Sequence, residues 1–286
     1  MRAMLACVEE VFREAAARWV LVAYFALSTL FVLLFGAAVN LDVVDGALAG
    51  VRLFGKEMHG GPSGMDLDRL VLGFESGFSA ILYLVGTFLA VFSTAHLVPR
   101  LQEKGTIDLY LSRPVGRVSL LLSRYVGGLL LAALNVYYLM GAIWAVVGIK
   151  TGVWNPRFLA GGTVILFAIA VLLAFAFLVG VATSSTAVSI MCTYALFFTS
   201  SVLAAHEKIE AALSSNWSAG LVKGLYWACP KTAALGQSVV LLASDGMAFG
   251  RGRSAFPDPL VAFGTSALFG IVCLALAAGL FSRKDF

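Results

Sequence analysis

The sequence predicts an all-α membrane protein, and three observations support that prediction. Apolar residues make up 60% of the 286 positions, whereas charged residues make up only 13%. Mean hydropathy is +0.92, far above that of soluble domains, in which about a quarter of the residues are charged. Only seven prolines accompany 29 glycines, a composition typical of a bundle of transmembrane helices.

Six windows of predominantly apolar residues are long enough to cross a bilayer, which takes about 20 residues of helix. We expect them to form one transmembrane domain over residues 1–286. Only residues 183–186, Thr-Ser-Ser-Thr, link the fourth window to the fifth, so these two windows predict a tight helical hairpin. The predicted spans are 19–39, 78–98, 120–148, 159–182, 187–205 and 260–281.

Residues 1–18 predict an interfacial helix that lies along the membrane surface before the first span. Acidic residues and the lack of an early apolar core with a cleavage site argue against a signal peptide. Apolar residues recur at helical spacing on the face opposite Glu9, Glu10 and Glu14. They are Leu5, Val8, Val11, Phe12 and Ala15. An ordinary solvated leader is the alternative interpretation.

Lysine and arginine are densest at the N-terminus, in residues 99–119 and in the C-terminal tail. Six spans put these segments on one side, and basic short loops mark the cytoplasmic side. We therefore expect an inner-membrane protein with both termini in the cytoplasm. The loops 40–77 and 206–259 then lie outside. The first suggests a turn and a short polar helix, and the second suggests re-entrant or interfacial helices, because its apolar runs are too short to span.

The sequence carries no motif of an intramembrane enzyme, since HExxH, GxSxG and paired carboxylates do not occur. Its cysteines and histidines lack metal-ligand spacing, so we expect neither catalytic residues nor a metal site, and no basic face suggests nucleic acid. Ion-coupled carriers place ionisable groups in their spans, whereas these spans are nearly free of charge. The chain has no GxxxxGK[ST] loop for ATP, so its energy must come from a partner at the cytoplasmic face.

The segment between the second and third spans, QEKGTIDLYLSRPVGR over residues 102–117, is the most informative motif. Its charges cannot lie in hydrocarbon, so it predicts a short amphipathic helix at the membrane face. Pro114 ends that helix, and Gly116 provides a turn into the third span. Two interpretations stay open on the residues alone: a helix that inserts into a groove of a partner, and a solvated positive loop.

Together with the surface helix and six spans, this motif resembles the permease subunits of the ABC-2 family of ATP-binding-cassette transporters. Those proteins typically carry an E-x-x-G-T-L-E-x-L-L-S-x-P segment between spans two and three; Asp108 replaces the more usual glutamate here. The resemblance implies that the segment and the N-terminal helix couple the chain to a nucleotide-binding subunit. The coupling residues so implied are Glu103, Lys104, Gly105, Thr106, Asp108, Tyr110, Ser112, Arg113, Pro114 and Arg117, with Glu9, Phe12 and Arg13 in the N-terminal helix.

The resemblance also implies a homo- or heterodimer of permeases that binds two copies of a separate ATPase, which holds ATP and Mg²⁺. The chain itself needs no cofactor. The substrate path is then expected at the dimer interface, beside spans two and five, whose apolar and aromatic residues suit an amphipathic or lipid-like cargo. Asn135 in span three is included, although a hydrogen bond between helices also explains a buried amide. The path residues are Tyr83, Thr87, Phe88, Phe92, Asn135, Thr193, Phe197, Phe198 and Ser201.

The large outer loops leave two other functions open. They depart from ordinary drug or polysaccharide exporters of the family and are similar to those of variant permeases found beside copper-enzyme maturation or gliding systems. One alternative is therefore a mechanotransmitter, which carries ATPase motion to a periplasmic partner without moving a solute. The other is a membrane enzyme or an ion-coupled carrier.

Overall fold

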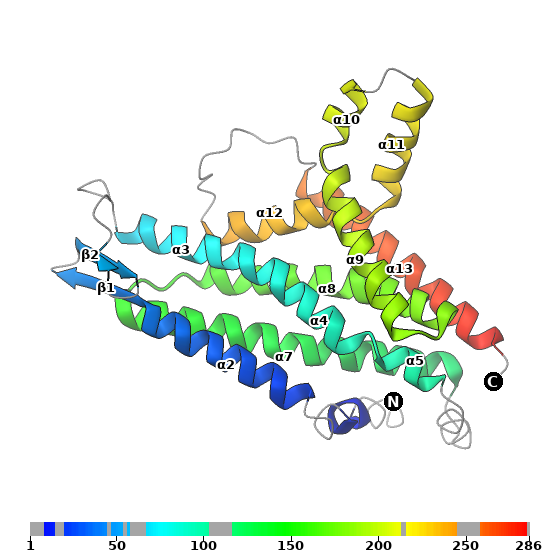
Figure 1. Ribbon diagram of the computed structural model, residues 1–286, viewed down its shortest axis with the longest axis horizontal. Helices are drawn as coiled ribbons and strands as arrows, with labels where there is room; N and C mark the ends of the chain where they lie inside the picture. The colour runs from blue at the N-terminus through cyan, green and yellow to red at the C-terminus, as the bar shows by residue number, and fades with distance from the viewer. Residues whose placement is uncertain are drawn as a thin grey trace.

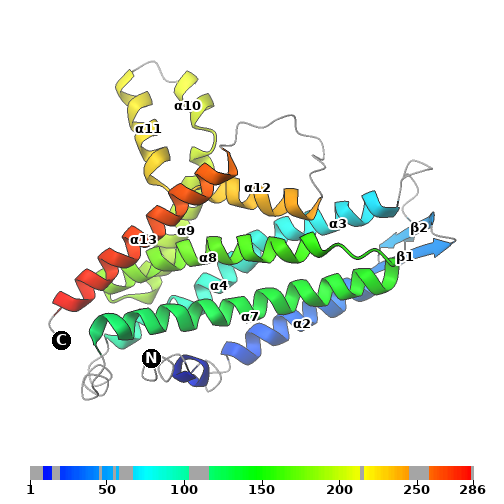
Figure 2. The ribbon, with the colours of Figure 1, turned by 180° about the vertical axis from the view of Figure 1, so that it is seen from behind.

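Helices form the body of the molecule, as predicted, and the long ones run side by side (Figures 1 and 2). The computed structural model describes residues 9–14, 20–44, 47–53, 56–57, 67–102, 116–212, 216–244 and 258–284. After a helical segment at residues 9–14, called the N-terminal helix below, the elements are α2 (Val20–Ala38), β1 (Val39–Val44), β2 (Ala47–Leu53), β3 (Lys56–Glu57), α3 (Leu67–Ile81), η1 (Leu82–Gly86), α4 (Thr87–Thr94), α5 (Leu97–Leu101), α7 (Arg117–Thr151), α8 (Pro156–Thr183), α9 (Thr186–Leu203), α10 (His206–Ala212), α11 (Asn216–Ala228), α12 (Thr232–Ala243) and α13 (Pro259–Arg283).

Five helical segments of the described chain are long and apolar enough to cross a membrane. Each overlaps one of the last five predicted spans. They are Val71–Leu101, Arg117–Thr151, Pro156–Thr183, Thr186–Leu203 and Pro259–Arg283. The first predicted span, 19–39, coincides with the 19 residues of α2, whose apolar stretch Phe25–Leu34 is shorter than a span. The six-span topology and the cytoplasmic termini therefore stay predictions.

The helices α7 and α8 form a long antiparallel hairpin whose turn is encoded locally. Gly152, at φ 74°, adopts the left-handed conformation that ends α7, which glycine does without steric cost. Asn155 accepts a hydrogen bond from the backbone N–H of Arg157, and Pro156 occupies the first helical position, a favourable start for α8. At 35 residues, α7 is about 52 Å long and exceeds the bilayer core of about 30 Å.

The second predicted span is a composite of α3, η1, α4 and α5. The segment η1 is one turn of π-helix, a rare irregularity that often marks functional positions. The composite begins well before residue 78, because α3 starts at Leu67. The short polar helix predicted in loop 40–77 is thus the beginning of α3, which continues into the membrane span.

A small antiparallel sheet in the order β1-β2-β3 occupies part of the predicted outer loop 40–77. The β1 and β2 strands pair from Val39 with Leu53 to Val44 with Ala47, and the register shifts by one residue after Asp42. Such a bulge is a common way to bend a strand pair. This sheet is the exception to the all-α class that the sequence predicts.

The described residues of the predicted outer loop 206–259 form three helices, α10, α11 and α12. The third, α12, packs along α3 and α8, and the amide of Asn155 donates to the carbonyl oxygen of Ala243 at its end. The pair α10 and α11 instead projects from the bundle as a helical hairpin (Figure 1). The segment therefore has one part that belongs to the core and one part that stands away from it.

Candidate functional site

The candidate site lies at the end of the bundle where α5 ends and α7 begins, here called the base (Gln102, Arg117, Ser184 and Lys284). Arg117 is the one predicted coupling residue of this segment that the structure describes. The other predicted coupling residues lie outside the described residues: Glu103, Lys104, Gly105, Thr106, Asp108, Tyr110, Ser112, Arg113 and Pro114. What the structure defines is how both ends of this segment are held.

The first end of the segment is fixed by Gln102. Its side-chain amide donates to the carbonyl oxygen of Gly180 at 3.2 Å. Its side-chain oxygen accepts from the hydroxyl of Ser184 and from the ammonium of Lys284 at 2.6 Å. Because Ser184 is the turn between α8 and α9, the segment begins against that turn and against the end of α13.

The second end of the segment is fixed by Arg117. Its guanidinium donates to the carbonyl oxygens of Ser282 at 3.3 Å and Lys284 at 2.9 Å. The ammonium of Lys284 in turn donates to the carbonyl oxygen of Val181 at 2.9 Å and to Ser184 at 2.7 Å. Both ends of the segment therefore meet the same place, the C-terminal end of α13.

The N-terminal helix packs on the same end of the bundle. Val11 is fully buried, and Phe12 packs beside it in an apolar cluster with α5, α7, α8 and α13. A Cβ atom at Gly127 of α7 would lie 2.9 Å from Cγ2 of Val11, so this close approach requires glycine. By contrast, the predicted residues Glu9 and Arg13 form an ion pair at 2.6 Å that is 62% and 79% exposed, and such pairs add little stability.

Glu14 joins three elements at the base, an arrangement that the sequence analysis did not predict. One carboxylate oxygen lies 2.9 Å from the guanidinium of Arg100 on α5, and the other lies 2.5 Å from that of Arg124 on α7. Arg124 is only 3% exposed, so its charge needs a nearby anion. We call these three residues the Glu14 bridge. In the sequence, the signal for it is an arginine about two turns inside α7.

The predicted substrate-path residues form two groups. Tyr83, Thr87, Phe88, Thr193 and Phe197 lie between the second composite span and α9. Phe88 stacks on Tyr194 at 4.3 Å between ring centroids, and the Tyr194 hydroxyl donates to the carbonyl oxygen of Phe88. This cluster is mostly interior to the protomer, because Thr87 and Thr193 are 1% and 0% exposed.

Of the remaining path residues, Phe198 packs at the edge of that cluster, with its ring centroid 5.6 Å from that of Phe88 and 5.9 Å from that of Phe197. Phe92 and Phe198 are 63% and 55% exposed, and Ser201 donates back to its own helix at the carbonyl oxygen of Phe197. Asn135 is remote from them, on α7, where its amide donates to the hydroxyl of Ser28 on α2 at 2.9 Å. The structure thus joins spans two and five but places Asn135 between α2 and α7.

Comparison with known families decides the class of the chain. Residues 12–206 match the family described as ABC-2 family transporter protein, which is 195 of 286 residues. The chain belongs to this family. No curated protein matches it. The match includes the Glu14 bridge, the segment between spans two and three and the contacts between spans two and five. This ABC-2 transporter protein is therefore the multi-pass membrane component of a transporter, a class that typically works with a separate ATPase subunit.

A second polar centre of this ABC-2 protein lies where α11 turns into α12, and the sequence analysis did not find it. The hydroxyl of Tyr83 donates to the carbonyl oxygen of Thr232 at 2.6 Å. The hydroxyl of Ser200 donates to the carbonyl oxygen of Pro230, and Ser266 accepts from the backbone N–H of Lys231 at 2.9 Å. Three spans thus contact the turn at the start of α12.

Lys231 in this turn predicts a pH effect on stability. Its ammonium lies 3.6 Å from the ring centroid of Tyr226 and donates to two carbonyl oxygens. Burial lowers the pKa of Lys231 to about 8, which the nearby Cys229 partly opposes. Above pH 8 the folded state releases the proton, whereas the unfolded state holds it to about pH 10.5. Unfolding then takes up a proton, so rising pH relieves an energetic cost that is fully present below pH 8.

Between about pH 7.5 and pH 10, the unfolding free energy of the native protein should rise by about 2–3 kcal/mol relative to that of Lys231→Met. Thermal unfolding of both proteins in detergent at pH 7.5 and at about pH 10 measures it. Both proteins contain Tyr226 and Cys229, whose pKa values burial raises. The titration of these two groups therefore cancels in the comparison. A difference that is constant across the two pH values would contradict the prediction.

Proposed function

We propose that this chain is a permease subunit that moves an amphipathic or lipid-like substrate across the inner membrane, powered by a separate ATPase. The observation that carries the proposal is the base. The ends of the 102–117 segment contact α13 and the turn between α8 and α9, and the Glu14 bridge adds the N-terminal helix. A push on that segment reaches four elements at once, as a rigid-body switch between two states requires.

In this proposal two permease protomers bind two ATPase subunits, which hold ATP and Mg²⁺. The exposed rings of Phe92 and Phe198 lie beside the interior aromatic cluster of spans two and five. Association of two protomers through this face would cover these rings and line a path with apolar and aromatic surface. Such a lining favours a substrate with an acyl chain or rings over a strongly hydrated one.

Charge reversal in the coupling segment tests the proposal. Glu103→Lys with Asp108→Lys should lower permease-stimulated ATP hydrolysis at least about tenfold, because the like-charge contacts at the interface cost several kcal/mol. The measurement uses proteoliposomes that contain the full chain and the Walker-A ATPase that co-purifies with it. Glu207→Lys, on the exposed α10, is the matched control and should retain activity. Unchanged hydrolysis and co-purification in the double variant would contradict the coupling role.

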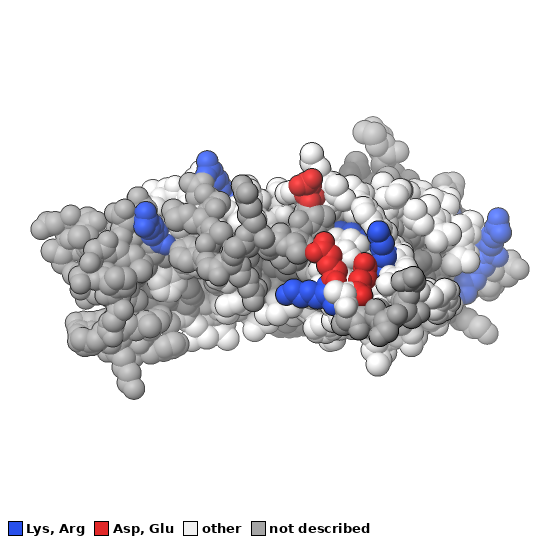
Figure 3. Space-filling view, turned by 90° about the horizontal axis from the view of Figure 1, so that it is seen from above, with Lys and Arg blue, Asp and Glu red and all other residues white. Residues whose placement is uncertain are grey.

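A mechanotransmitter is the second candidate function, and the hairpin of α10 and α11 favours it. Trp217, Leu221 and Leu225 are 76%, 48% and 53% exposed and recur at four-residue spacing on one side of α11. Figure 3 shows acidic and basic side chains gathered over this part of the molecule. A periplasmic partner that covered this surface would receive the motion of the bundle. In the same proteoliposomes, ATP hydrolysis that begins only after such a partner is added would favour this function over the permease.

A further inference from the structure

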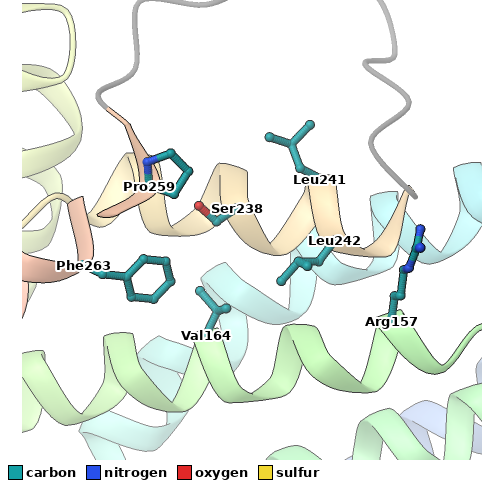
Figure 4. Close-up of a pocket in the computed structure, with 7 residues that line it drawn as sticks. All are labelled: Arg157, Val164, Ser238, Leu241, Leu242, Pro259 and Phe263. Carbon is teal, nitrogen blue, oxygen red and sulfur yellow. The ribbon is translucent and has the colours of Figure 1, made fainter. Parts of the chain in front are cut away.

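A groove of about 500 Å³ lies between α8, α12 and α13 (Figure 4). It is formed at the N-terminal ends of α8 and α13 and along the outer face of α12, away from the base. Five of its lining residues are apolar. They are Val164, Leu241, Leu242, Pro259 and Phe263. A volume of this size is in the range of small-molecule sites.

The polar groups of the groove are few and unequal. The hydroxyl of Ser238 donates to the carbonyl oxygen of Ala234 at 2.9 Å within α12, so it has no second hydrogen to donate to a ligand. Among the described residues that line the groove, Arg157 is the only charged one; its side chain is exposed and stands at one end of the groove in Figure 4. At the other end the ring of Phe263 packs on that of Phe167, with 5.1 Å between the centroids. The groove therefore has a cationic end and an apolar end.

The position of the groove along α8 gives it a direction relative to the membrane. The 28 residues of α8 are about 42 Å long, so its first turns extend beyond a hydrocarbon core of about 30 Å. Arg157 lies in the first turn, and Val164 lies about 10 Å further along the axis. A ligand in the groove would thus have its charged group at headgroup level and its apolar part at the edge of the hydrocarbon.

We propose that this groove binds one acyl chain of an anionic phospholipid, whose phosphate pairs with Arg157. The described lining is mostly apolar and suits an acyl chain, which gains about 0.8 kcal/mol for each buried methylene group. Guanidinium is also the side chain best suited to phosphate. This lipid stays bound to the protein and is not the transported substrate, because none of the groove residues belongs to the predicted substrate path.

Photolabelling tests this site in the full chain. The protein is placed in nanodiscs of phosphatidylcholine with phosphatidylglycerol that carries a diazirine in one acyl chain, and labelled peptides are identified by mass spectrometry. Labels are expected in peptides that contain Leu241, Leu242 or Phe263. Arg157→Gln should lower phosphatidylglycerol labelling about tenfold, the effect of one lost charge-assisted contact. Labelled phosphatidylcholine should be unaffected. Arg69→Gln removes an exposed charge on α3 and should change neither.

A second variant separates the acyl chain from the headgroup. Ser238→Phe fills the groove and should abolish labelling by both lipids, while thermal unfolding shows that the variant is folded. Three outcomes would overturn the proposal: equal labelling by phosphatidylglycerol in Arg157→Gln and the native protein, labels confined to peptides outside the groove, or competition by glycerol phosphate alone. The last would reveal an anion site without an acyl chain.

Discussion

Glu14→Gln should disconnect the N-terminal helix from the bundle and uncouple the transporter. The amide keeps the shape of the side chain but removes the charge that Arg100 and Arg124 share. Removing one partner of a fully buried ion pair costs about 3–5 kcal/mol. Glu14 is 23% exposed and Arg100 is 26% exposed, so solvent screening reduces the expected loss to about 1–3 kcal/mol. The unfolding temperature in detergent and permease-stimulated ATP hydrolysis should both fall.

Glu9→Gln is the matched control, since it makes the same substitution in the same helix. Glu9 contacts Arg13 in an exposed pair, so its loss should change the unfolding free energy by less than about 0.5 kcal/mol. A double variant, Glu14→Gln with Arg100→Gln, should be less destabilised than the sum of the two single variants, because they remove the same contact. Equal effects of Glu14→Gln and Glu9→Gln would show that the bridge has no structural role.

Five of the six proposed membrane spans could be predicted because hydropathy decides them. A helix with about 20 apolar residues buries its backbone polar groups wherever it lies in the bilayer, and this requires no knowledge of its neighbours. The same reasoning identified the turn at 183–186, where α8 ends at Thr183 and α9 begins at Thr186. For Asn135, which the sequence analysis included in the substrate path, the contact with Ser28 agrees with the alternative interpretation, a hydrogen bond between helices.

The start of the second span could not be predicted in the same way. Glu75 and Ser76 of α3 precede the predicted span and look like residues outside the membrane, yet they are 2% and 6% exposed. They are buried in protein and not in lipid. One oxygen of Glu75 accepts from the amide of Asn155 at 2.7 Å, a residue 80 positions away. Hydropathy measures transfer from water to an apolar solvent, so it cannot recognise a polar group that a distant partner satisfies.

The candidate site could likewise be predicted only in part. Sequence predicts a surface position for the charged segment 102–117, because charge cannot lie in hydrocarbon, and it predicts the N-terminal helix from its apolar spacing. The sequence alone could not predict which residues these side chains contact. Lys284 contacts Gln102 across 182 positions, and Arg124 contacts Glu14 across 110. Each cation had several acidic residues within the same predicted surface. Only the packing of α5, α7 and α13 selects among them.

Gly236→Ala should separate α12 from the second span. A Cβ atom at Gly236 would lie 2.8 Å from Cε1 of the Tyr83 ring, which is closer than real contacts allow. The ring cannot move aside easily, because its hydroxyl donates to the carbonyl oxygen of Thr232 on the same helix as Gly236. Overpacking of a well-packed core costs about 1–3 kcal/mol. We expect that loss in thermal unfolding, together with reduced transport-coupled ATP hydrolysis.

Gly264→Ala on α13 is the control, since a Cβ atom there has nothing within 4 Å and alanine favours helix over glycine by about 1 kcal/mol. Tyr83→Leu removes the obstructing ring and also the hydroxyl, so it is destabilising by itself. Combined with Gly236→Ala, it should cost less than the sum of the two single variants, because the steric conflict needs both side chains. Additive costs would place the effect in contacts of α12 other than the one with Tyr83, because alanine by itself favours the helix. Ser200, which contacts the same turn from α9, would then hold α12 to the bundle.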